Sequence, residues 1–164
     1  MTNPTARGWC LHWLLITNSM EVWWIGADGS VWDAYWYEGG LWNQFQLAPP
    51  GSASTYGGIT AVSRMPNTME VMWIGQDGSV WDAYWYAGQP WNIYRLAPPN
   101  SASVNGRSIT AVSRMPNTIE IWWIGPDGSV QDAYGTKGHN GVGSNWLLRA
   151  VLPPLAALPP CREC

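Results

Sequence analysis

The sequence has little charge, and the charge it has does not form a basic surface. Of its 164 residues 12% are charged, the formal net charge is −3, and Lys137 is the only lysine. Proteins that bind nucleic acid gather lysine and arginine on one surface to contact the phosphates. We therefore expect no nucleic-acid partner.

Long apolar runs and helical periodicity are also missing. No apolar stretch approaches the roughly 20 residues that span a bilayer, so we expect no membrane insertion. The short run 11–16 lacks the flanking features of a signal peptide. We therefore expect a protein that is cytoplasmic or is released without a classical signal. Apolar residues nowhere sustain a helical period, which predicts almost no helix.

Cysteine and histidine are too scarce to form a recurring site. Cys161 and Cys164 form one C-x-x-C pair without the second ligand pair that a zinc site needs, and the role of Cys10 stays open. His12 and His139 lie outside the repeated blocks described below. The carboxylates recur in every repeat, whereas an active site is usually unique. The sequence thus predicts no metal, no cofactor and no enzyme.

Tryptophan, by contrast, is abundant. The chain has 14 Trp and 7 Tyr but only 1 Phe. Trp and Tyr combine a broad apolar face with a polar group, which suits a surface that binds something. The alternative is that these residues are the repeated core of the fold, and we expect both uses.

A block of residues occurs almost three times along the chain. It reads MEVWWIGADGSVWDAYWYEGG from Met20, MEVMWIGQDGSVWDAYWYAGQ from Met69, and IEIWWIGPDGSVQDAY from Ile119. A period of about fifty residues is typical of a propeller or another array of supersecondary units. Any site that one unit builds is then available to the next.

Each repeat predicts four short β-strands. In the second repeat they are ITAVSR, MEVMWIG, SVWDAYWY and WNIYRLA, separated by turn residues. An Asp-Gly pair between two β-rich runs is a strong hairpin signal, and it recurs in all three repeats. Repeated units of four antiparallel strands predict the blades of an all-β propeller.

The chain holds about three such blades, and both outer ones are degenerate. Residues 1–19 correspond to a worn first strand of blade 1, and 20–58 to the rest of that blade. Blade 2 is 59–108, and blade 3 is 109–154 with a loop insertion at 135–145. A Pro-rich tail, 155–164, follows.

Three blades are too few for a closed ring, since propellers have roughly four to eight. Either copies of the chain assemble, for example two copies in a six-bladed ring, or the chain is a fragment of a longer protein. Both interpretations stay open at the level of sequence.

Three blocks carry a resemblance to a known family: EVWWIGADGSVWDAYWYEGG, LAPPGSAS and GGITAVSRMPNT. They resemble the repeats of the bacterial PLL-type lectins, which are fucose-binding seven-bladed β-propellers. The resemblance covers 20–134, with a weaker continuation to 154. It implies a non-enzymatic propeller that forms homo-oligomers and binds glycans between adjacent blades, with fucose and related or O-methylated sugars as ligands.

The sequence also departs from the family pattern. It has about three blades instead of seven. Leu14-Leu15 stand where the second repeat has Ser63-Arg64, and Gly135-Thr136-Lys137 stand where the first has Trp-Tyr-Glu.

The resemblance places candidate sugar-binding residues at two junctions. Aromatic faces would stack on the sugar ring, while Arg and Glu would bond its hydroxyls. For blades 1 and 2 the candidates are Trp36, Tyr37, Glu38, Trp42, Arg64 and Glu70. For blades 2 and 3 they are Trp85, Tyr86, Trp91, Arg114 and Glu120. A salt bridge of Arg64 with Glu70, and of Arg114 with Glu120, is the structural alternative.

The function predicted from sequence is therefore a carbohydrate-binding lectin for fucose-like or O-methylated sugars. Copies of a weak site on a rigid scaffold would bind together through avidity. The alternatives are a propeller scaffold or self-assembly module whose aromatic residues only pack, or a degenerate fragment without function.

Overall fold

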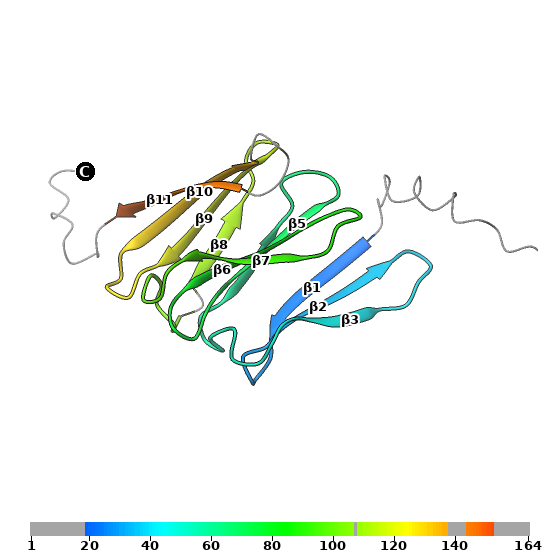
Figure 1. Ribbon diagram of the computed structural model, residues 1–164, viewed down its shortest axis with the longest axis horizontal. Coiled ribbons are helices and arrows are strands. Elements are labelled where there is room, and N and C mark those ends of the chain that lie inside the picture. Colours follow the sequence, from blue (N-terminus) through cyan, green and yellow to red (C-terminus); the bar gives the residue numbers. More distant parts are fainter. Residues whose placement is uncertain (1–18, 107, 138–143, 153–164) are drawn as a thin grey trace, which may run out of the picture.

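The computed structural model describes residues 19–106, 108–137 and 144–152, and in this part every regular element is a β-strand (Figure 1). The strands form three antiparallel sheets that stand side by side. This confirms the predicted all-β class and the scarcity of helix. Within the described residues no helix is long and apolar enough to cross a bilayer.

The three sheets follow the three repeats, and we call them blades 1, 2 and 3. Blade 1 contains β1 (Ser19–Ile25), β2 (Val31–Tyr37) and β3 (Asn43–Ala48). Blade 2 contains β4 (Ile59–Val62), β5 (Thr68–Ile74), β6 (Val80–Tyr86) and β7 (Asn92–Ala97). Blade 3 contains β8 (Ile109–Val112), β9 (Thr118–Ile124), β10 (Val130–Lys137) and β11 (Ser144–Leu152). In each blade the strands pair in chain order.

The strand bounds can be set beside the predicted units. The strands of blades 2 and 3 fall inside 59–108 and 109–154. The predicted insertion 135–145 is partly strand, because β10 continues to Lys137 and β11 begins at Ser144. The predicted first strand of blade 1 lies outside the described residues except for Ser19, and the tail 155–164 lies outside them entirely.

The Asp-Gly pairs form the predicted hairpin turns. In blade 2, Gly78 has a φ of +74°, a conformation that favours glycine. The carboxylate of Asp77 accepts a hydrogen bond from the backbone N–H of Ser79 at 3.0 Å, and the Ser79 hydroxyl accepts one from the Trp81 indole at 2.8 Å. The turn thus fixes the first aromatic side chain of the next strand.

Each blade has two chemically different faces, because neighbouring side chains in a strand point to opposite sides. One face, which we call the tryptophan face, carries Trp24 and Trp32 in blade 1, Trp73 and Trp81 in blade 2, and Trp123 and Gln131 in blade 3. The other face, the acidic face, carries Glu21 and Asp33, Glu70 and Asp82, and Glu120 and Asp132 in the same order.

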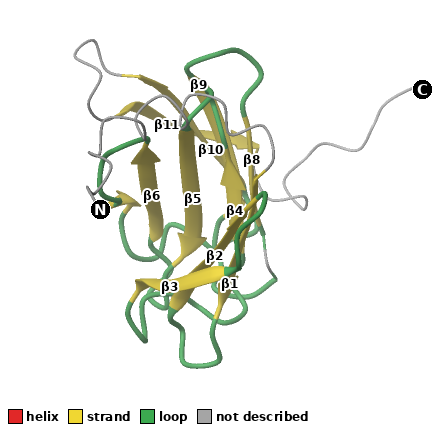
Figure 2. Ribbon diagram, turned by 90° about the vertical axis from the view of Figure 1, so that its right-hand side faces the viewer, coloured by secondary structure: helices red, strands yellow, loops and turns green. Residues whose placement is uncertain are grey.

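The hydrophobic cores lie between the blades. At the first junction, the tryptophan face of blade 2 packs Val71 and Trp73 against Val31 and Leu47 on the acidic face of blade 1. At the second junction, Met72 on the acidic face of blade 2 packs in one cluster with Ile121 and other residues of blade 3. The short strands β4 and β8 lie next to each other along one edge of the molecule (Figure 2).

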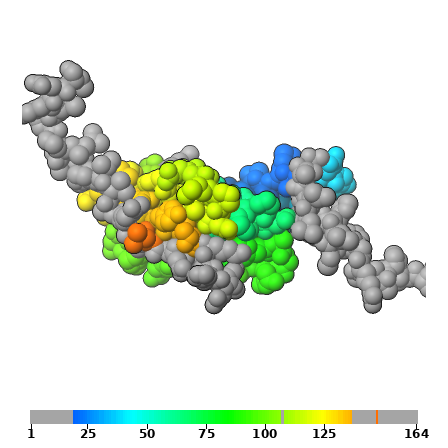
Figure 3. Space-filling model, turned by 90° about the horizontal axis from the view of Figure 1, so that it is seen from above, coloured from blue at the N-terminus to red at the C-terminus, as the bar shows by residue number. Residues whose placement is uncertain are grey.

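The row of blades is open at both ends among the described residues. Viewed from above, the blades follow one another from blue through green to yellow (Figure 3). No described strand covers the tryptophan face of blade 1 or the acidic face of blade 3. Val22 on the first of these faces is 50% exposed, whereas Val71, at the same place in blade 2, is 0% exposed.

Candidate binding site between the blades

A pocket of about 390 Å³ opens at the first junction. The acidic face of blade 1 and the β4–β5 turn and tryptophan face of blade 2 form its walls. Aromatic, apolar and hydrogen-bonding side chains line it: Ser19, Glu21, Trp23 and Tyr37 from blade 1, and Ser63, Pro66, Asn67, Thr68, Met69 and Trp85 from blade 2.

The β4–β5 turn is held rigidly by its own hydrogen bonds. Thr68 donates its hydroxyl to the Met65 carbonyl at 2.8 Å, and the Ser63 hydroxyl donates to the same carbonyl at 2.7 Å. Asn67 has a φ of +62°, which asparagine tolerates better than most residues. The blade 2 wall of the pocket is therefore formed before any ligand arrives.

Two carboxyl groups of blade 1 lie in this junction, and burial makes both hard to ionise. Burial, and then the charge of Asp33, raises the pKa of Glu21 to about 7. Burial also raises the pKa of Asp33 to about 6, against the opposing effect of the Trp23 indole. Near neutral pH the Glu21 carboxyl can thus either donate or accept a hydrogen bond.

Asp33 keeps one unused acceptor atom. Its Oδ1 atom is buried and makes no hydrogen bond of normal geometry with a described residue, while the Trp23 indole faces this carboxyl group and lowers its pKa. The Oδ1 atom of Asp82 in blade 2 is buried in the same way, so this feature is not specific to the first junction.

At the second junction, between blades 2 and 3, the residues at the corresponding repeat positions make different contacts. Arg64 forms an ion pair with Glu70, with side chains 1% and 2% exposed. Arg64 Nη2 also donates to the Tyr86 hydroxyl at 2.8 Å, and the Arg64 carbonyl accepts from the backbone N–H of Asn117 in blade 3 at 3.2 Å. Blade 3 therefore closes over this ion pair and leaves it almost no access to solvent.

A second acidic group lies close to this ion pair. Tyr94 donates its hydroxyl to Asp82, which is fully buried. Burial raises the pKa of Glu70, Asp82 raises it further, and Arg64 lowers it. Burial likewise raises the pKa of Asp82, while the Tyr94 hydrogen bond and Arg64 oppose this effect.

Blade 3 repeats the ion pair on its open face. Arg114 bonds to Glu120, but here the arginine side chain is 66% exposed and the glutamate 12%. Both arginines thus form an ion pair with the glutamate of their own blade. The contrast with Arg64 shows what a following blade does to this pair: it removes the arginine from water.

The structure distributes the predicted site residues over different faces from those expected. Tyr37 lines the pocket, but its neighbour Trp36 points to the open tryptophan face. Trp42 is half-exposed just before β3, and Glu38 is exposed in the turn after β2. Arg64, Glu70 and Tyr86 come together at the second junction instead of the first. Trp85 lines the pocket of the first junction, Trp91 packs against the core of that junction, and Arg114 and Glu120 lie on the open acidic face.

The reason for this difference is the alternation of side chains. Each repeat sends most of its tryptophans toward the preceding blade and its Arg, Glu and second Tyr toward the following one, while Trp23 and Trp122 lie on the acidic face. Glu21, Trp23 and the β4–β5 turn were missing from the predicted pocket. Glu21 in β1 pairs with Tyr35 in β2, and Tyr37 lies two residues further along β2, so the two-residue period of the strands puts Glu21 and Tyr37 on one face.

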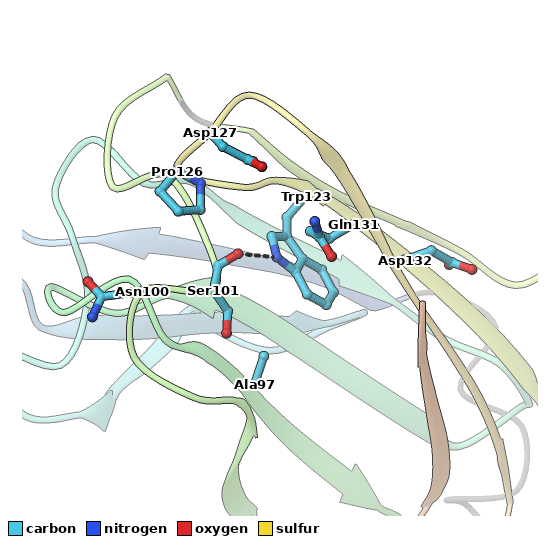
Figure 4. A pocket seen from close by; sticks show the side chains of 8 residues that line it. All are labelled: Ala97, Asn100, Ser101, Trp123, Pro126, Asp127, Gln131 and Asp132. Atoms are coloured by element: carbon cyan, nitrogen blue, oxygen red, sulfur yellow. Dashed lines mark hydrogen bonds between the residues drawn. The ribbon is translucent and has the colours of Figure 1, made fainter. Parts of the chain in front are cut away.

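A second pocket, of about 380 Å³, opens at the opposite end of the strands at the second junction (Figure 4). Trp123 lies at its wall and donates its indole N–H to the Ser101 carbonyl at 2.9 Å. Trp73 stacks on Trp81 with ring centres 6.5 Å apart, but in blade 3 the smaller Gln131 takes the second place and lines the pocket. The space exists where the repeat has lost a ring.

Neither junction contains a metal site within the described part of the chain. No group of three or more His, Cys, Asp or Glu side chains there could hold an ion.

Comparisons with known proteins identify the fold of this chain, and they do so through solved structures. No protein-family model matches the sequence, and no curated protein does so either. The solved structures that match include three with a TM-score of 0.60 or more. They are the BP39L lectin from Burkholderia pseudomallei (22% identity, TM-score 0.70, 84% of this chain and 38% of that one), the SapL1 lectin in complex with alpha methyl fucoside (19%, 0.62, 84% and 44%), and AofleA from Arthrobotrys oligospora (23%, 0.60, 85% and 40%).

At these identities the likeness establishes the architecture. The chain has the fold of part of a lectin β-propeller, as the sequence resemblance predicts. It spans about two fifths of the length of the structures it matches.

Proposed function

We propose that this chain is a carbohydrate-binding module, and that the pocket of the first junction is a sugar site. One observation carries the proposal: this pocket sets the rings of Tyr37 and Trp85 beside the hydrogen-bonding side chains of Glu21 and Asn67. A sugar has the complementary surface, with an apolar C–H face and hydroxyl groups around its edge. The proposed role is binding and not catalysis.

The pocket also supports a more specific ligand. Met69 and Pro66 add apolar surface to the wall of blade 2. A methyl group on the sugar, as in a 6-deoxy or O-methylated ring, would contact this surface while the remaining hydroxyls bond to Glu21. We therefore propose fucose-like or O-methylated sugars, and the alpha methyl fucoside bound to the SapL1 lectin supports this choice.

The competing function is a scaffold whose aromatic residues serve only packing. The second junction favours it, because the side chains of Arg64 and Glu70 are 1% and 2% exposed and cannot reach a ligand without movement. Under this interpretation the pocket of the first junction would be a packing defect between blades 1 and 2.

Calorimetry with methyl α-L-fucoside separates the two functions. Trp85→Ala should weaken binding by more than about tenfold, because it removes an aromatic wall of the site. Tyr37→Phe, which removes only a hydroxyl group, should weaken binding without affecting the fold. Tyr56→Ala is the matched control, since Tyr56 is 66% exposed and does not line the pocket.

The outcomes are distinct. Loss of binding in Trp85→Ala and Tyr37→Phe, with unchanged circular dichroism and an unaffected Tyr56→Ala, supports the sugar site. A folded chain that binds no fucoside and no glycan on an array would rule it out and leave the scaffold.

A further inference from the structure

We propose that Asn105, in the loop that joins blade 2 to blade 3, is a site of spontaneous modification: its side chain loses ammonia and leaves aspartate or isoaspartate in the backbone. The loop runs from the end of β7 to the start of β8. The site lies outside the residues that line the two pockets, and it does not rest on the proposed function.

The reaction is an attack by the backbone on a neighbouring side chain. The amide nitrogen of Gly106 bonds to the Cγ atom of Asn105, the bond from Cγ to Nδ2 breaks, and Nδ2 leaves as ammonia with the proton that the Gly106 nitrogen gives up. The product is a cyclic imide. Water then opens this ring at either carbonyl group. The result is aspartate if the original backbone is kept, and isoaspartate if the backbone now passes through the former side chain.

Gly106 gives the attacking nitrogen an open approach. Asn105 and Gly106 are both exposed, and a Cβ built on Gly106 would meet no described residue within 4 Å. Gly106 has a φ of +105°, a conformation that favours glycine, and it has no side chain to obstruct the approach. Gly57, in the loop before β4, is packed instead, since a Cβ there would lie 2.8 Å from the Ile74 Cβ atom.

The amide nitrogen of Gly106 is also uncommitted in the described part of the chain, where it makes no backbone hydrogen bond. In the turns that contain Asn67, Asn100 and Asn117, the next residue donates its backbone N–H to a carbonyl at 3.0 to 3.2 Å: Thr68 to Met65, Ser101 to Gly78, and Thr118 to Met115. A nitrogen held in this way cannot turn toward the preceding side chain. These three asparagines should therefore keep their amide groups.

The ends of the loop are fixed, so its apex keeps the open arrangement. Ser103 donates its backbone N–H to the Ile124 carbonyl at 2.7 Å, and the Ile124 N–H donates to the Ser108 carbonyl at 3.2 Å. The Ser103 hydroxyl donates to the Asn105 carbonyl at 2.9 Å, which polarises the peptide group that contains the Gly106 nitrogen. The end of β9 thus holds the loop on both sides of the apex formed by Asn105 and Gly106.

Modification of Asn105 should also reach the neighbouring loop. The Val104 carbonyl accepts a hydrogen bond at 2.8 Å from the hydroxyl of Ser54, in the loop between blades 1 and 2. Isoaspartate would add a carbon atom to the backbone of the next residue and introduce a negative charge there. We therefore expect the hydrogen bonds of Ser103 and Val104 to weaken once Asn105 has been modified.

The first experiment follows amide loss in the 164-residue chain by peptide mapping with mass spectrometry during incubation in mildly alkaline buffer. We expect loss at Asn105 before any at Asn67, Asn100 or Asn117, at a rate that rises with pH because the attacking nitrogen must lose its proton. The map resolves Asn140 separately; it also precedes a glycine and lies outside the described residues. A folded chain that keeps the Asn105 amide as long as the other three would overturn the proposal.

A parallel incubation in urea separates the effect of the fold from that of the dipeptide. Unfolding breaks the turn hydrogen bonds, so amide loss at Asn67, Asn100 and Asn117 should speed up, whereas the rate at Asn105 should change little. A rate at Asn105 that rises on unfolding as much as the other three would show that the fold protects this residue, against the proposal.

The route is tested with a variant and a trapping reagent. Gly106→Ala should slow the loss, because a methyl group would obstruct the approach of the nitrogen. Gly58→Ala is the matched control, since Gly58 has a φ of +97° in a loop without asparagine and should leave the rate at Asn105 unchanged. Hydroxylamine, which cleaves a cyclic imide, should cut the wild type between residues 105 and 106. Equal rates in the wild type and Gly106→Ala, or amide loss without a hydroxylamine-sensitive bond, would rule out attack by Gly106.

Hydrogen exchange then measures the effect on the loop. In the modified chain the backbone N–H of Ser103 should exchange faster, because its bond to Ile124 has weakened. The N–H of Ala102 is the internal reference, since it bonds to the Gly78 carbonyl at 2.8 Å within blade 2 and should stay protected. Unchanged exchange at Ser103 would contradict the expected weakening.

Discussion

Arg64 and Arg114 hold the same repeat position and the same glutamate partner, yet only Arg64 is buried. Replacing Arg64 with Met would leave Glu70 buried beside Asp82 without its counter-charge. We expect Arg64→Met to lower the free energy of unfolding by about 3–5 kcal/mol. Arg114→Met should leave it nearly unchanged, because an exposed ion pair contributes little. Urea denaturation of both variants gives the comparison, and equal losses would contradict it.

Glu21 makes stability depend on pH. Its pKa is raised by burial from 4.5 to about 7, so the folded chain holds this proton more tightly than the unfolded chain does. The resulting stabilisation is complete below about pH 4.5 and is lost as the pH rises toward about 7. We expect the free energy of unfolding to fall across this range, with Asp33 contributing at its lower end. Glu21→Gln should flatten the profile, and a slope unchanged by this substitution would show that Glu21 is not its source.

The sequence identified many of the important residues without showing where they meet. The Arg–Glu pairs could be predicted because both residues recur in phase. The grouping of these residues at each junction could not be predicted, because the two-residue period puts Trp36 and Tyr37 on opposite faces but does not say which face meets the next blade. That information comes from the handedness and order of the packed sheets.

At the scale of elements, two glycines of the Asp-Gly hairpins differ in how closely neighbouring atoms surround them. Gly78 and Gly128 have φ values of +74° and +81°, but a Cβ on Gly78 would lie 2.8 Å from the Ala102 carbonyl oxygen, whereas one on Gly128 would meet no described residue within 4 Å. Gly128→Ala should cost about 1 kcal/mol for the left-handed backbone alone. Gly78→Ala should cost clearly more, and thermal unfolding of the pair measures the difference. Equal costs would mean that the loop moves aside freely.

Filling the pocket beside Trp123 should raise the free energy of unfolding. Gln131→Trp would restore the stacked pair that Trp73 and Trp81 form in blade 2. We expect a gain of about 0.5–1.5 kcal/mol in the free energy of unfolding, the usual range for an aromatic pair. Gln131→Leu fills volume without a ring and should gain less, as denaturant titration can show. A destabilised Gln131→Trp would indicate that the pocket cannot admit the ring.

Strands were the most predictable elements, because repeats, β-branched residues and turn signals agree about them. The fourth strand of blade 3 is β11, and it falls inside the predicted blade 3 at 109–154. The length of β10 was not predicted, because the glycine-rich sequence after Tyr134 has lost the repeat while its backbone still pairs as far as Lys137.

At the scale of the whole molecule, assembly should be visible in stability. If copies meet through their open faces, the folded state is stabilised by mass action. The melting temperature of the wild type should then rise with protein concentration over a hundredfold range. That of Val22→Glu, which places a charge on the exposed tryptophan face of blade 1, should stay constant, and calorimetry at several concentrations distinguishes the two. A wild-type melting temperature independent of concentration would argue against any contact between copies.

The two-faced blade also bears on how such a chain changes over generations. Every junction takes one half from each of two neighbouring repeats, so the repeat is not the heritable unit of a binding site. A substitution that erodes one repeat reaches two junctions, a different half in each. Duplication of a single repeat, by contrast, creates a new junction from two halves that have already been selected. Loss and gain of sites would therefore follow different routes in the same gene.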